Sequence, residues 1–241
     1  KVSFTLVEEE DRRGGLMRKL AFRLESIMLV CLLFILMGTA SAQELFLPEE
    51  VRPGLKGVGK TVISGNTIET FDVEVLGLVP QSPPLSNLIM IRVSGSVIER
   101  SGGIAQGMSG SPVYIDNRLL GAIGYIYSHT DHRIGLVTPA VDMFKLYDQL
   151  PLPEPVLPPD ATAMRSPLIV QGLNDRNMRY LSEALGAEQV QVMPSFSSNY
   201  LYGSSVLENG SMIGVQLLRG DFQVASFGTV TDVREDGRSI A

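Results

Sequence analysis

The sequence contains no tryptophan and only one cysteine, Cys31, among its 241 residues. A single cysteine cannot form an intramolecular disulfide, and it cannot supply the several thiolates of a cysteine-based zinc site. Basic residues are in the minority, with 20 Lys and Arg against 26 Asp and Glu, and none of them form a cluster interleaved with aromatic side chains. Because nucleic-acid binding depends on grouped Lys and Arg that neutralise phosphates, we expect no nucleic-acid partner.

An N-terminal secretion signal is predicted over residues 17–42. Basic residues that follow Met17 precede an apolar run at 27–37, and Ala40-Ser41-Ala42 then matches the small-residue pattern of a cleavage site. These three parts stand in the order of a secretory signal, so we expect the protein to work outside the cytoplasm, either secreted or in the cell envelope. Residues 1–16 show no periodicity and are interpreted as an upstream, non-native segment.

The alternative to a cleaved signal is a membrane anchor. A transmembrane helix needs about 20 apolar residues, and the run at 27–37 is shorter than that. The pattern therefore favours cleavage after Ala42, and it makes the membrane a partner only if the signal remains uncleaved.

Residues 43–150 are predicted to form a β domain that ends in a helix. Asp116-Asn117 predicts a tight hairpin, because both residues tolerate the left-handed backbone conformation. Thr138 and Pro139 predict a helix that continues to about Leu150, with Thr138 as its N-cap. β-Branched and alternating apolar residues predict strands at 61–63, 70–79, 88–93, 113–115 and 119–127.

The remainder of the chain is predicted as a linker followed by a second β portion. Residues 151–167 hold six of the fourteen prolines, which is typical of a linker or an extended connection. Residues 168–241 are interpreted as the second, truncated part of a β domain, with a turn at Glu235-Asp236-Gly237 shortly before the last residue. Its expected elements are a helix at 174–185, capped by Asn174 and stopped by Gly186, and strands at 190–193, 213–218 and 226–233.

The segment Gly107-Met108-Ser109-Gly110-Ser111-Pro112 has the composition of a nucleophile loop. Glycines around a serine let the backbone turn sharply and direct N–H groups at one point, where they can stabilise an oxyanion. The spacing G-x-S-G-x-P is that of chymotrypsin-like peptidases, and a hairpin follows it here as it does there. In that comparison Ser109 is the nucleophile, and the N–H groups of Gly107 and Ser109 form the oxyanion hole. The alternative is an ordinary Gly/Ser turn of a β protein.

Several longer stretches resemble one family, the sporulation protein IVB peptidases. The resemblance implies a mainly β chymotrypsin- or trypsin-like barrel with two short helices, incomplete at the C-terminus. It also implies an extracytoplasmic serine endopeptidase that cleaves protein or peptide substrates through an acyl-enzyme on Ser109, without a cofactor. The resembling stretches are 52–62, 71–77, 102–113, 214–217 and 219–221.

Two departures from this family leave a second interpretation open. The family pairs its serine with a Gly-His histidine, whereas His129 and His132 follow Ser109 in a polar segment that is interpreted as a solvated loop. No carboxylate or cysteine cluster supports a metal site there. The resemblance to relatives with a permuted order places the base just past Ala241, and the position of the family's acid is occupied by Ser94. The alternative is therefore a non-catalytic, peptidase-like module that binds peptides or partners at the cell envelope.

Overall fold

The computed structural model describes residues 43–127, 131–148, 152–185, 190–191 and 206–241. The predicted signal at 17–42, His129 and Gly186 lie outside the described residues. In the described part of the chain, no helix is long and apolar enough to cross a membrane.

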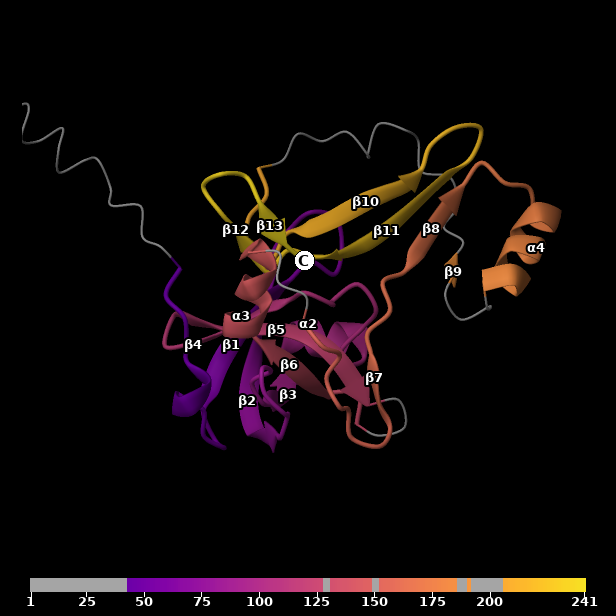
Figure 1. Cartoon of the computed structure of the whole chain (residues 1–241). Coiled ribbons are helices and arrows are strands. Elements are labelled where there is room, and N and C mark those ends of the chain that lie inside the picture. The colour runs from indigo at the N-terminus through magenta and orange to yellow at the C-terminus, as the bar shows by residue number, and fades with distance from the viewer. Residues whose placement is uncertain (1–42, 128–130, 149–151, 186–189, 192–205) are drawn as a thin grey trace, which may run out of the picture. The chain divides into compact units, whose positions relative to one another are not determined.

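Six antiparallel strands close into a barrel in the first half of the described chain (Figure 1). The strand order is β4-β1-β2-β3-β6-β5, and an additional pairing of β4 with β5 completes the ring. This architecture confirms the prediction of a mainly β, trypsin-like barrel. The strands are β1 (Lys56–Thr61), β2 (Glu69–Val79), β3 (Leu88–Ser94), β4 (Pro112–Ile115), β5 (Arg118–Tyr127) and β6 (Ile134–Pro139), with β7 (Ala161–Ala163) added antiparallel to β5.

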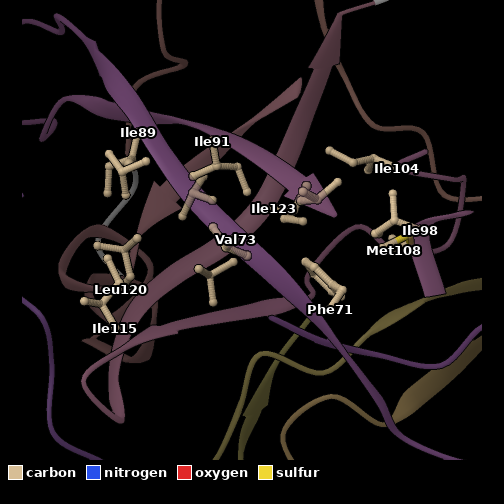
Figure 2. Packing of buried hydrophobic residues seen from close by; sticks show 14 of the residues in the cluster. Phe71, Val73, Ile89, Ile91, Ile98, Ile104, Met108, Ile115, Leu120 and Ile123 are labelled. Carbon is tan, nitrogen blue, oxygen red and sulfur yellow. The ribbon is translucent and has the colours of Figure 1, made fainter. Parts of the chain in front are cut away.

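The barrel encloses the main hydrophobic core (Figure 2). On β2, Phe71, Val73 and Val75 are buried while the intervening Asp72 is exposed, which is the alternation expected of a strand with one face inward. Met108, from the nucleophile loop, belongs to the same cluster and is 1% exposed. The loop is therefore fixed to the core by the side chain that directly precedes Ser109.

The predicted hairpin at Asp116 and Asn117 is confirmed, since both residues have positive φ, 49° and 62°, between β4 and β5. The first strand was predicted at the wrong place, because β1 begins at Lys56 and ends at Thr61. The glycines of this strand interrupt the pattern of β-branched and apolar residues by which a strand is predicted. A Cβ on Gly59 would overlap the ring of Phe71, so this strand must lack side chains where β2 presses against it.

The short helices agree with the sequence only in part. The predicted N-cap Thr138 instead lies in β6, opposite Ala122 of β5, because that strand pairing continues to Pro139. The helix at 174–185 is confirmed, and Asn174 caps it by accepting the amide of Asn177 at 2.9 Å. The helical elements are η1 (Pro48–Glu50), the unpredicted α2 (Ser96–Ser101), α3 (Ala140–Met143), η2 (Phe144–Asp148) and α4 (Asp175–Leu185).

The C-terminal part forms a four-stranded sheet and a small hairpin (Figure 1). The predicted strand at 226–233 is divided in two, because the chain changes hydrogen-bonding partner at Val230, whose amide donates to Ser211. The turn predicted at 235–237 is confirmed between the last two strands. The sheet has the order β10-β11-β8-β9, from β8 (Leu168–Gln171), β9 (Val190–Gln191), β10 (Met212–Leu218) and β11 (Gln223–Thr229), and the hairpin joins β12 (Asp232–Val233) to β13 (Ser239–Ile240).

Tyr147 of η2 attaches this hairpin to the element that follows the barrel. Its hydroxyl donates to Asp232 Oδ2 at 3.0 Å, and its own carbonyl accepts from Arg238 Nη1 at 3.1 Å. The guanidinium of Arg234 lies 3.5 Å from the centre of the Tyr147 ring. Burial, followed by the hydrogen bond to Asp232, raises the pKa of Tyr147 to about 12.

We predict that Tyr147→Phe loosens the hairpin and changes how stability depends on pH. Loss of the donor to the buried Asp232 carboxylate should cost about 1.5–3 kcal/mol in the free energy of unfolding near pH 8. The raised pKa means that the tyrosine contribution is complete below about pH 10 and is lost as the pH rises towards 12. Urea unfolding at several pH values should show this alkaline decline in the wild type and a weaker one in the variant. The control is Tyr180→Phe, because Tyr180 is exposed. If stability fell as much at alkaline pH in Tyr147→Phe as in the wild type, the role of this contact would be contradicted.

Candidate active site

The nucleophile loop, residues 107–112, connects the segment after α2 to the start of β4. Its two serines differ in exposure. Ser109 is half-buried, whereas Ser111 is 0% exposed and its hydroxyl has no hydrogen-bond partner in the described part of the chain. Of the two serines, only Ser109 is partly exposed.

The two glycines that flank Met108 and Ser109 are required for different reasons. Gly107 has a φ of +92° and open space around it, so only the backbone conformation demands glycine. Gly110 has a φ of +85°, and a Cβ on it would also overlap the carbonyl oxygen of Thr229. The loop is thus shaped by backbone conformation on one side of Ser109 and by close contact on the other.

The backbone N–H groups of the loop fall into two sets. The amides of Met108, Gly110 and Ser111 donate to backbone carbonyls at 2.9 to 3.1 Å. The amides of Gly107 and Ser109 have no acceptor among the residues that the structure describes. These two amides are the ones that the sequence assigns to an oxyanion hole.

A segment far away in the sequence holds the carbonyl side of the loop. The amide of Thr229 donates to the Ser109 carbonyl at 2.8 Å, and its hydroxyl donates to the Gly107 carbonyl at 2.9 Å. The hydroxyl of Thr231 donates to the Gly110 carbonyl at 2.7 Å. Sequence reasoning did not single out these threonines, which lie in a run of four consecutive buried residues from Thr229 to Asp232.

A second contact supports the same arrangement. The Asn209 side-chain nitrogen donates to the Tyr114 hydroxyl on β4 at 3.3 Å, and its oxygen accepts the amide of Val233 at 3.0 Å. Burial is the main cause that raises the pKa of Tyr114, so this hydroxyl stays protonated. Asn209 thereby ties the β12 strand to the outside of the barrel.

Ala241 lies next to the nucleophile loop. A Cβ built on Gly110 would be 3.0 Å from the carbonyl carbon of Ala241. The β12–β13 hairpin therefore brings residue 241 close to Gly110, the residue that follows Ser109.

The other residues weighed from the sequence do not meet Ser109 in the described part of the chain. His132 is exposed, and it contacts the start of the loop through its carbonyl, which accepts the amide of Ile104 at 2.7 Å. Ser94 is exposed at the end of β3, opposite Asp72 of β2. No hydrogen bond joins either side chain to Ser109, and no cluster of His, Cys, Asp and Glu suited to a metal ion occurs among the described residues.

Residues 39–140 match the family model described as SpoIVB peptidase S55. The match supports the SpoIVB peptidase family for this part of the chain. The S55 region contains all six strands of the barrel and the whole nucleophile loop. The family supports a serine peptidase, in agreement with the barrel fold. No curated protein matches the chain.

We predict that alanine at Gly110 damages the S55 region more than alanine at Gly107. Both changes place a side chain at positive φ, which costs about 1–2 kcal/mol. Only Gly110→Ala also pushes against the Thr229 carbonyl, so it should lose clearly more unfolding free energy in urea titrations. Equal losses for the two variants would contradict the close contact between the loop and residue 229.

Proposed function

We propose that this chain carries the nucleophile and oxyanion hole of an extracytoplasmic serine endopeptidase. The observation that carries the proposal is the coincidence of three features in one loop of a SpoIVB-family barrel. Ser109 is partly exposed, and the amides of Gly107 and Ser109 are the ones in the loop without an acceptor in the described chain. A protein or peptide is the substrate, and no cofactor is needed for this chemistry.

The proposed reaction proceeds through an acyl-enzyme. Ser109 Oγ attacks the scissile carbonyl carbon while a base removes its proton, and the carbonyl oxygen becomes an oxyanion bound by the two free amides. Collapse of this intermediate releases the amine, which takes the proton from the base, and leaves an ester on Ser109. Water activated by the same base then hydrolyses the ester and restores the hydroxyl.

The base is proposed to be a histidine in the continuation of the chain after Ala241. The contact between Ala241 and Gly110 supports this placement, because each further residue extends the chain by at most about 3.6 Å. A histidine a few positions later can therefore approach Ser109. The codons that follow Ala241 should encode a Gly-His pair, and their absence from the gene would remove this base from the proposal.

A non-catalytic, peptide-binding module is the second candidate. The favouring observation is that the Ser109 hydroxyl has no base or acid as partner within the described ranges, while Ser94 is an exposed, uncharged residue. In this case the free amides of Gly107 and Ser109 would bind a carbonyl or carboxylate oxygen without cleavage.

Work outside the cytoplasm is proposed from residues 17–42, whose pattern is that of a secretion signal. Mass spectrometry of the protein recovered from its host should find Gln43 as the first residue. A mature protein that still contains residues 17–42 would instead be a membrane-tethered form.

We predict that Ser109→Ala abolishes peptide hydrolysis by the natural protein. Removal of a serine nucleophile typically lowers kcat by about 10⁶-fold, so hydrolysis of a fluorogenic peptide should fall to background. Labelling by a serine-directed phosphonate should be lost as well.

The matched control is Ser111→Ala, two residues away in the same loop. Its buried hydroxyl has no partner among the described residues, so its removal should leave both stability and kcat near the wild-type values. Retained hydrolysis in Ser109→Ala would rule out the nucleophile assignment. A wild type that binds peptides but hydrolyses none would favour the binding module.

A further inference from the structure

We propose that Thr229 and Thr231 are positioning residues that keep the oxyanion hole open by holding three peptide groups of the nucleophile loop. The catalytic consequence of this inference rests on the function proposed above, whereas the structural part does not. The two threonines lie outside the S55 region, which ends at residue 140.

Three peptide groups of the loop are held at both ends. In the 107–108 peptide, the carbonyl accepts from Thr229 Oγ1 and the Met108 amide donates to Ala105. In the 109–110 peptide, the carbonyl accepts from the Thr229 amide and the Gly110 amide donates to Ile123.

The third of these is the 110–111 peptide. Its carbonyl accepts from Thr231 Oγ1, and the Ser111 amide donates to the Met108 carbonyl. Since the N–H and C=O of a trans peptide point in opposite directions, a partner at each end fixes the orientation of the whole group.

The two amides without an acceptor in the described chain belong to the 106–107 and 108–109 peptides, one on each side of the fixed 107–108 peptide. The Ser109 N–H and the Met108 carbonyl belong to the same trans peptide and point in opposite directions. The Met108 carbonyl accepts from the Ser111 amide, so the Ser109 N–H points away from Ser111. The Gly107 amide precedes the carbonyl that Thr229 holds. The 107–108 peptide shares the α-carbons of Gly107 and Met108 with the two peptides that carry the free amides, so a displacement of this peptide would displace both amides.

Solvent has little access to the two hydroxyl groups. Thr229 is 1% and Thr231 is 0% exposed, and a buried carbonyl without a donor is costly. When the hydroxyl of Thr229 is removed, the 107–108 peptide loses one of its two partners and is free to turn. The oxyanion hole then depends on a contact between residues that are 122 positions apart in the sequence.

Paired substitutions separate the hydroxyl group from the shape of the side chain. Thr229→Val and Thr231→Val keep the shape and remove the donor, whereas Thr229→Ser and Thr231→Ser keep the donor. Thr61→Val is the matched control, since Thr61 is 0% exposed and its hydroxyl has no partner in the described residues.

The first measurement is the steady-state hydrolysis of a fluorogenic peptide by the full natural protein. Loss of oxyanion alignment should lower kcat by about 10²-fold in Thr229→Val and leave KM within about threefold of wild type. Thr229→Ser should recover most of kcat, and Thr61→Val should not change it. A serine variant as slow as the valine variant, or a change confined to KM, would overturn the inference.

The second measurement keeps the inference testable even if the proposed function fails. Amide hydrogen exchange followed by NMR should become about tenfold faster at Met108 in Thr229→Val and at Ser111 in Thr231→Val, and the serine variants should restore the wild-type rates. Unchanged exchange at both amides would overturn the positioning role. Absent hydrolysis by the wild type would count against the peptidase alone, and exchange would then decide the inference.

Discussion

The close contact between residues 228–231 and the nucleophile loop is the constraint on which the candidate site depends. One strand segment reaches three loop carbonyls, and it approaches Gly110 so closely that no side chain fits between them. In the same loop, the amides of Gly107 and Ser109 have no acceptor within the described ranges of the chain. The barrel supplies the serine, and the C-terminal part supplies the donors to three carbonyls of its loop.

The barrel and the hairpin provide the two rigid sides of this contact. On the barrel side, Met108 is buried in the core and fixes the residue before Ser109. On the other side, the hydrogen bond from Tyr147 to Asp232 and the stacking of Arg234 attach the β12–β13 hairpin to η2. A serine loop held from both sides needs little rearrangement when negative charge develops on a substrate oxygen. Such preorganisation is the condition for electrostatic stabilisation of an oxyanion.

Sequence reasoning found the features that local residue patterns encode and missed those that depend on distant contacts. The strands at 88–93 and 119–127 and the loop around Ser109 were predicted, because apolar runs and Gly/Ser spacing are local signals. The glycine-rich β1 was misplaced, and α2 is too short for a helical period to appear. Thr138 has the local pattern of a helix cap, and only its pairing with β5 shows that it lies in a strand. The partners of Thr229 lie too far along the chain for any local pattern to reveal them.

The central claim is that Ser109 is the nucleophile and that the amides of Gly107 and Ser109 form the oxyanion hole. The most direct test is a crystal structure of the full natural protein after reaction with a peptidyl phosphonate. The account predicts a phosphorus–oxygen bond to Ser109 Oγ, with the phosphonyl oxygen about 2.7–3.1 Å from the amide nitrogens of both Gly107 and Ser109. A phosphonate attached to another residue, or a phosphonyl oxygen directed away from these amides, would contradict it.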